Sequence, residues 1–220
     1  MKTNIFSFTV VAGCCLSLLA LPRVSQAQGF YLNAGAGVAI ANDLKISRFI
    51  NPTPGMKLEL DPGPRFDVAG GYNFNDFCAV QIETGFMVNN VDGVSTGGDI
   101  DAVVSHVPLL VDFVIRYDKP DFNFVPFIGI GCGGDISVLT VDHVYAPGGS
   151  LVDGTGSTAV FAWQAFAGAR FKINPKMSIG GAYKYFSANG ANWDVEHSSG
   201  DIKSGSAQVH SIMVDFTIKF

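Results

Sequence analysis

The chain has 220 residues, of which 48% are hydrophobic and 15% are charged, and its formal net charge is −5. This length suits one domain, and the acidic balance argues against a nucleic-acid partner, because binding a phosphate backbone requires a basic surface. The sequence contains only four cysteines. No histidine stands at metal-ligand spacing from Cys78 or Cys132, so we expect no metal, no cofactor and no catalytic role for them.

The N-terminal segment has the pattern of an export signal. A short cationic start precedes an apolar run over residues 5–21, and small residues stand at Ser25 and Ala27. This pattern predicts that residues 1–27 are a signal peptide cleaved after Ala27, which makes residues 28–220 the mature domain. The apolar run is marginal in length for a membrane-spanning helix of about 20 residues. Lipoprotein-type cleavage within the run is the alternative.

The mature chain consists of alternating segments separated by Gly, Pro, Asn and Asp. The expected strands are 29–41, 58–73, 77–90, 102–117, 123–139, 158–172, 177–188 and 207–220. The tight connections are 73–76, 118–122 and 173–176, and the long polar ones are 42–57, 91–101, 140–157 and 189–206. This alternation predicts an all-β fold: an eight-stranded antiparallel up-and-down transmembrane β-barrel with short periplasmic turns and four long extracellular loops.

The last expected strand shows the two-faced pattern clearly. Phe216, Ile218 and Phe220 fall on one face, while Asp215 and Lys219 fall on the other, because strand side chains alternate between two faces. In a membrane barrel the apolar face meets lipid and the polar face lines the lumen. A soluble lipocalin-like barrel, with its apolar face inside, is the alternative architecture.

Charged residues of the polar faces are predicted to gather at similar depths inside the barrel. The predicted lumen cluster consists of Arg65, Asp67, Glu83, Asp112, Arg116, Arg170, Lys184 and Asp215. An eight-stranded barrel is just wide enough for its own side chains, and buried charges require partners. We therefore interpret the cluster as a static, ion-paired interior. A narrow ion-conducting pore is the alternative.

Aromatic residues collect on the apolar faces close to the tight turns. The predicted periplasmic girdle consists of Phe30, Tyr72, Phe74, Tyr117, Phe124 and Phe171, together with Phe220. A ring of aromatic side chains at one height is typical of a membrane–water interface. Trp163, Tyr185 and Phe86 are candidates for a second ring near the opposite ends of their strands.

The segment Gly29–Gly37, the eight-strand pattern and the final Phe220 resemble the small bacterial outer-membrane β-barrel superfamily, which includes the OmpA barrel domain, OmpX and the opacity proteins. The resemblance implies a place in the cell outer membrane, in contact with membrane lipid and lipopolysaccharide. It also implies that the final strand, with Phe216, Ile218 and Phe220, is the signal read by the barrel-assembly machinery.

The resemblance further admits a lipid A-modifying, deacylase-like enzyme, which needs His, Ser and an acid on one surface. The pairs Ser105–His106 and His210–Ser211 are sequence neighbours, so their side chains point to opposite faces of a strand. We therefore expect no catalytic residue, and we keep the enzyme as the alternative from another functional class.

The long loops carry most of the remaining functional signal. Those at 91–101, 140–157 and 189–206 are acidic, while that at 42–57 has basic character. We interpret the acidic loops as solvated surface, with coordination of divalent cations shared with lipopolysaccharide phosphates as the alternative. Binding commonly resides in loops on a rigid scaffold. We thus expect a non-enzymatic protein with a structural role, or with adhesion or contact to an extracellular ligand or host surface through these loops.

Overall fold

The computed structural model describes residues 28–48, 56–94, 101–145, 151–195 and 202–220. The predicted signal peptide, residues 1–27, lies outside these ranges and stays a prediction. Among the described residues, no helix has the length and apolar character needed to cross a membrane.

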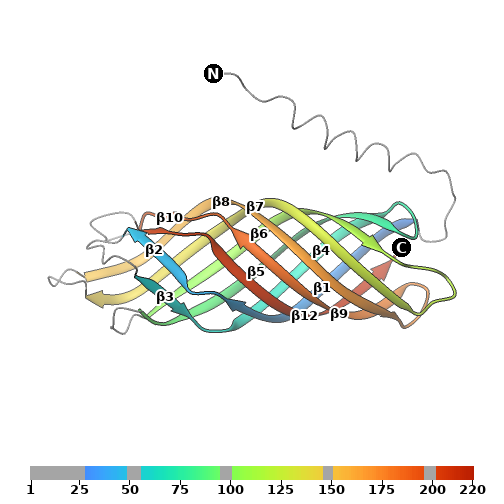
Figure 1. Ribbon diagram of the computed structural model, residues 1–220, viewed down its shortest axis with the longest axis horizontal. Helices are drawn as coiled ribbons and strands as arrows, with labels where there is room; N and C mark the ends of the chain where they lie inside the picture. Colours follow the sequence, from blue (N-terminus) through green and yellow to red (C-terminus); the bar gives the residue numbers. More distant parts are fainter. Residues whose placement is uncertain (1–27, 49–55, 95–100, 146–150, 196–201) are drawn as a thin grey trace, which may run out of the picture.

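The described chain consists of β-strands joined into one antiparallel sheet (Figure 1). Their bounds are β1 (Gly29–Ala41), β2 (Leu44–Arg48), β3 (Lys57–Leu60), β4 (Gly63–Asn73), β5 (Cys78–Val94), β6 (Asp101–Arg116), β7 (Phe124–Tyr145), β8 (Leu151–Lys172), β9 (Met177–Ala188), β10 (Asn192–Trp193), β11 (Ile202–Ser204) and β12 (Ala207–Lys219). Strands β1, β4, β5, β6, β7, β8, β9 and β12 close into a barrel, which confirms the predicted eight-stranded architecture.

The barrel closes between its first and last strands. Strand β12 pairs with β1 from Tyr31↔Lys219 to Ala41↔Val209, and β4 pairs with the other edge of β1. Closure leaves the barrel sheet without a free edge, so its backbone donors and acceptors are satisfied between strands, as a membrane requires. The tight turns lie at one end of the barrel, here called the turn end, and the longer connections lie at the other, the loop end (Figure 1).

The loop end contains more strand than the sequence pattern predicted. Strands β2, β10 and β11 form inside connections that were predicted to be loops, and they extend the sheet in the order β10–β11–β2–β3–β5. Strands β7 and β8 pair beyond the predicted limits, as far as Tyr145↔Leu151. The predicted strand 58–73 is divided into two elements: β3 and β4 pair one after the other with β5, residues 61–62 lie between them, and β3 also pairs with β2. Pro62, which has no N–H to donate, separates β3 from β4.

The two faces of the barrel differ sharply in exposure. On β6, Leu109 is 60% exposed on the outer face, while its neighbour Leu110 is fully buried in the interior. Other outward residues that are at least 45% exposed include Val68, Ile82, Val111, Ile115, Ile128, Ile130, Ile179, Ile212 and Val214. An apolar band this wide around a closed barrel is the surface that a membrane covers.

Glycine on a facing strand makes room for two of the interior aromatic rings. Phe166 of β8 lies directly over Gly129 of β7, and a Cβ on Gly129 would overlap the ring. Tyr31 of β1 lies in the same way over Gly71 of β4. The missing side chains therefore make the space that these two rings fill, and the interior is packed rather than hollow.

We predict that Gly129→Ala destabilises the folded barrel by about 1–3 kcal/mol, because the added methyl group overpacks the interior against Phe166. The matched control is Gly134→Ala on the same strand, since Gly134 faces outward and a Cβ there meets only one atom, at 4.0 Å. Urea unfolding of the refolded protein in lipid vesicles measures both. Equal midpoints for the two variants would contradict the packing described here.

Candidate functional site

The centre of the lumen is organised around Lys184 of β9. Its Nζ donates hydrogen bonds to Asp67 Oδ2 on β4 and Glu83 Oε2 on β5, each at 2.7 Å. Arg65, one inward position away from Asp67, lies 3.4 Å from Glu83 and 3.6 Å from Asp67. All four side chains are buried. The alternation of strands places these charges inside, and their pairing offsets the cost of taking them out of water.

Polar uncharged side chains complete this central network. Gln164 Nε2 donates to Glu83 Oε1 at 3.1 Å and to Asp112 Oδ1 at 2.9 Å, and Gln81 Nε2 donates to Asp112 Oδ2 at 2.8 Å. Asp112, predicted as a member of an ion-paired cluster, is thus held by two amides instead. Gln81 and Gln164 lie on the inward parity of their strands, but the predicted lumen cluster contained only charged residues and so did not include them.

Arg170 and Asp215 form a separate pair closer to the turn end. Arg170 Nε donates to Asp215 Oδ1 at 2.7 Å, and its guanidinium lies 4.2 Å from the ring centroid of Phe127. Asn33 Nδ2 donates to the same Asp215 oxygen and to Thr217 Oγ1, both at 2.9 Å. The hydrogen bonds of Asp215 therefore connect strands β1, β8 and β12, and the contact between Arg170 and the Phe127 ring adds strand β7.

The turn end is closed by Asp118, which the sequence analysis assigned only to a tight turn. Its carboxylate accepts from Lys219 Nζ and lies 2.8 Å from Lys172 Nζ and 3.3 Å from Arg116 Nη1. Burial alone would raise the pKa of Asp118, but the hydrogen bonds from Lys172 and Lys219 outweigh it and lower the pKa below the ordinary value. Arg116 thus belongs to this turn-end cluster and not to the central network.

The interior of the loop-end half is apolar, which differs from the fully polar lumen expected from the sequence. A buried cluster of Ala39, Met87, Leu110, Ala162, Phe186, Ala188 and Val209 covers the central network. Beyond it lies a larger core of Leu44, Ile46, Met56, Leu58, Val91, Ala102, Val104, Leu139, Val141, Ala191, Trp193, Val195 and Ile202. Much of this core comes from segments that were predicted to be polar loops. Their inward apolar residues pack against one another and against the ends of the barrel strands, which removes them from water.

One buried polar pair lies at the junction between the polar and apolar halves. His106 Nδ1 is 2.6 Å from Asp135 Oδ2, and the His106 ring contacts the edge of Phe186. The other carboxylate oxygen of Asp135 and the hydroxyl of Ser137 make no hydrogen bond within the described residues. The sequence analysis placed His106 and Ser105 on opposite faces of a strand, but it did not identify Asp135 as the partner of His106.

The cavities found in the lumen are small. One lies among the charges of the central network and another beside Asp118, and each holds about 10 Å³, roughly the space of one water molecule. Within the described residues, no group of three or more His, Cys, Asp or Glu side chains could hold a metal ion. The chemistry of this interior is thus that of paired charges and packed side chains.

The predicted aromatic girdle residues lie on the outer surface around the turn end. Phe30 packs edge-on against Tyr72, and Tyr72 against Phe74, with ring centroids 5.0 and 5.4 Å apart. Phe124 packs against Phe171 in the same way. The other contacts join Tyr117 to Phe77 and Phe122, which the predicted girdle did not include. Phe122 lies in the predicted turn 118–122, and Phe77 begins the predicted strand 77–90.

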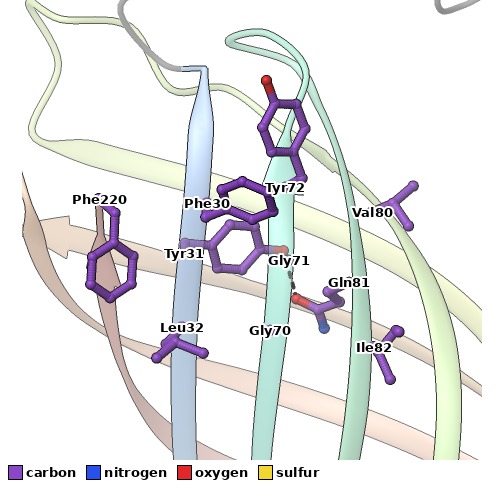
Figure 2. Close-up of a pocket in the computed structure, with 10 residues that line it drawn as sticks. All are labelled: Phe30, Tyr31, Leu32, Gly70, Gly71, Tyr72, Val80, Gln81, Ile82 and Phe220. Atoms are coloured by element: carbon purple, nitrogen blue, oxygen red, sulfur yellow. Dashed lines mark hydrogen bonds between the residues drawn. The ribbon is translucent and has the colours of Figure 1, made fainter.

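The predicted assembly residues lie on the same outer surface. Phe220 is 68% exposed and Ile218 is 37% exposed, while Phe216 is half-buried. Phe220 borders an apolar groove of about 490 Å³ whose lining includes Gly70 and Gly71 (Figure 2). Beneath it the Tyr31 hydroxyl donates to Gln81 Oε1 at 2.8 Å. The groove offers apolar contact within the band that lipid covers.

Replacing Lys184 by Met is predicted to destabilise the barrel by about 3–5 kcal/mol, because it leaves Asp67 and Glu83 buried without their shared cation. Lys176→Met, in an exposed turn, is the control and leaves stability unchanged within about 0.5 kcal/mol. Adding Asp67→Asn alone to Lys184→Met recovers most of the loss, as measured by urea unfolding in vesicles, because Glu83 then remains paired with Arg65. A single variant as stable as wild type would show that the network is not held by charge pairing.

Asp118→Asn is predicted to cost about 1–3 kcal/mol at pH 7, because three cations lose their common acceptor. The folded-state pKa of Asp118 lies below the unfolded value of about 3.9. Its contribution is therefore complete above that value and is lost as the pH falls through the folded pKa. Urea midpoints of wild type and Asp118→Asn should converge as the pH is lowered below about 4. A difference that stays constant down to pH 2 would contradict this assignment.

Comparison with known proteins places this geometry in a family. A family model described as "Outer membrane protein beta-barrel domain" matches residues 6–217, whereas no curated protein matches the sequence. The structure of the outer membrane protein OprG from Pseudomonas aeruginosa is similar, with a TM-score of 0.57 and 15% identity over 89% of this chain and 99% of that chain. Neisserial surface protein A has a TM-score of 0.54 and 16% identity over 87% and 97%.

A major outer membrane protein from Thermus thermophilus is also similar, with a TM-score of 0.51 and 13% identity over 88% of this chain and 100% of that chain. At these identities the likeness establishes the fold. Outer-membrane barrels have short turns toward the periplasm and longer connections toward the outside, so we assign the turn end to the periplasm and the loop end to the extracellular side. Since the family model matches nearly the whole sequence, this chain belongs to the family of outer-membrane protein β-barrel domains.

Proposed function

We propose that this protein is a non-conducting, non-enzymatic barrel whose role is carried by its extracellular end, which presents a folded β-surface for contact with molecules outside the cell. The observation that carries this proposal is the apolar core under strands β2, β3, β10 and β11. Surface connections without such a core would be solvated loops. Here their outward residues are displayed from a supported sheet, as in binding sites built on rigid scaffolds.

Trp193 is the central support of this surface. Its side chain is 1% exposed, and its Nε1 donates to the backbone oxygen of Ser137 on β7 at 3.1 Å. The neighbours Asn192 and Asp194 are exposed. Trp193 on β10 therefore packs in the core, while Asn192 and Asp194 on either side of it are exposed to solvent. A contact surface is expected to combine a packed apolar support with exposed polar residues.

The filled lumen favours this role over that of a pore. Ions would have to pass the paired charges around Lys184 and then the apolar layer that contains Leu110 and Phe186. A dry apolar layer is a barrier to ions, because transfer of a charge into an apolar medium is expensive. The small lumen cavities at the central network give no wider route at that level.

The placement of histidine and serine disfavours a hydrolase on the lipid-facing surface. His210 lies on the outer face and its Nδ1 is 2.5 Å from the Tyr183 hydroxyl. Its neighbour Ser211 points into the lumen, where Arg65 Nη1 donates to it at 3.2 Å. His106 is buried in the interior beside Asp135. Among the described residues, neither histidine thus has a serine nucleophile in hydrogen-bond reach on a surface that lipid contacts.

Planar bilayer recording tests the closed lumen. The purified, folded protein is predicted to give no step conductance, while an open porin added to the same bilayer reports a working assay. Single-channel steps from the wild-type protein would reject the non-conducting barrel in favour of the narrow pore.

Lipid A from cells with and without the protein should have the same mass spectrum, and loss of an acyl chain would reject the non-enzymatic role.

The extracellular surface is tested by Trp193→Ala, which removes about 3–5 kcal/mol of packing from the apolar core. Cells carrying the wild-type protein are predicted to adhere to coatings of laminin, fibronectin or collagen more than cells lacking it, and cells with Trp193→Ala should lose the excess. Lys176→Gln, an exposed substitution in a turn at the opposite end of the barrel, is the control and should adhere as wild type does. Equal adhesion of cells with and without the protein on every coating would contradict a surface-contact role.

A further inference from the structure

A polar groove of about 570 Å³ lies on the outer surface at the extracellular end of the barrel. It is formed where β1 passes into β2 and where β11 passes into β12, with β3 alongside. The residues that matter for its chemistry are Asn42, Asp43, Lys45, Lys57, Gly205 and Gln208. The groove is separate from the lumen and from the apolar groove beside Phe220.

Two lysines are brought together at this groove by strand register. Lys45 of β2 and Lys57 of β3 are direct partners across the antiparallel pair. Like charges in such positions repel each other and weaken the pairing of the strands. Asp43 lies 3.7 Å from Lys57 Nζ, in a pair whose side chains are 51% and 43% exposed. Among the described residues that line the groove, two lysines are thus accompanied by one carboxylate.

The groove lies at the height where the outer surface changes from apolar to polar. Ile40 of β1 and Ile212 of β12 are 45% and 66% exposed on the lipid-facing band. The next outward residues past Ile40 and His210 are Asn42 and Gln208, whose side chains bond to each other at 3.1 Å. This change marks the extracellular surface of the membrane, where the headgroups of the outer leaflet lie.

Aromatic side chains support the same height. His210 stacks against Tyr183 and Tyr185, and Tyr185 contacts Trp163, with ring centroids 5.2 to 6.0 Å apart. Tyrosine and tryptophan concentrate at membrane–water interfaces because they are amphipathic. His210 is two residues from Gln208 on the same outward face of β12. The groove therefore begins at the outer edge of the membrane.

The groove is also built to admit an anionic group closely. The backbone N–H of Gly205 donates to the Lys45 carbonyl oxygen at 2.7 Å, which fixes the start of β2 against the connection to β12. A side chain at Gly205 would come within 3.6 Å of Lys45 Cβ, so glycine keeps this wall low. The ammonium groups of Lys45 and Lys57 are suitable donors for phosphate oxygens.

We propose that this groove binds a phosphate group of lipopolysaccharide in the outer leaflet, with Lys45 and Lys57 as its charged donors. The height of the groove at the lipid headgroups selects this source over free phosphate, because a phosphorylated lipid is held at that level by its own acyl chains. Asp43 opposes binding, since its carboxylate faces the same anion. The groove would thus fix lipid against the seam between β1 and β12 at the base of the extracellular sheet.

The test uses the full-length folded protein in nanodiscs and lipid A as the probe, with binding measured by native mass spectrometry and microscale thermophoresis. Lys45→Gln and Lys57→Gln are each predicted to weaken binding roughly fivefold, and together about thirtyfold. Asp43→Asn should instead tighten binding roughly threefold to fivefold. Lys176→Gln, at the periplasmic end, is the charge-matched control and should bind as wild type does. The heat-dependent gel shift of each variant verifies that it is folded.

Three results would overturn the proposal. The first is equal binding of lipid A and of lipid A stripped of its phosphates. The second is a double lysine variant that folds and binds lipid A as tightly as the Lys176→Gln control. The third is displacement of bound lipid A by millimolar inorganic phosphate, which would assign the groove to the free ion. Conversely, opposite effects of Asp43→Asn and the lysine substitutions would support it, because a purely apolar lipid contact would not respond to charge in this way.

Discussion

The hydrogen-bonded seam between β1 and β12 joins the first and last strands of the barrel, from Tyr31↔Lys219 to Ala41↔Val209. In lipid, each unpaired backbone donor or acceptor costs several kcal/mol, so an open sheet edge is excluded there. Closure with eight strands also fixes the diameter, which is just wide enough for side chains. Every inward residue must consequently share a narrow space, and each inward charge must have a partner within it. Closure at the seam thus leaves no unpaired backbone edge toward lipid, and it also requires that the charges inside the barrel pair with one another.

The interior meets this requirement differently at its two ends. Toward the periplasm, Asp118, Asp215 and Lys184 each have oppositely charged partners within 3 Å on other strands. Toward the outside, the inward positions are apolar, and the barrel continues into the core that includes Trp193. The pair of His106 and Asp135 lies between the two regimes. Without His106, the Asp135 carboxyl group would be buried next to the apolar layer without a partner.

The strand pattern of the sequence was sufficient to predict the barrel and its inward residues, because alternation is a local property. It placed Lys184, Asp67 and Glu83 on inward faces without knowledge of the structure. It could not predict which of them are in contact, since that depends on register between distant strands. Asp118 was missed because alternation has no meaning in a turn. The apolar positions of β2 were assigned to a loop, because a strand this short shows too few alternations to be recognised.

The packed interior has a consequence for how the extracellular end can vary. Strand β2 turns Leu44 and Ile46 into the core, and Lys45 and Ser47 outward. Replacement of an inward residue changes the volume of a filled core and therefore lowers the stability of the folded barrel. Replacement of an outward one changes only charge and hydrogen bonding at the surface. Alternate residues of one strand therefore serve separate tasks, and the surface can acquire new contacts without loss of the fold that holds it at the membrane.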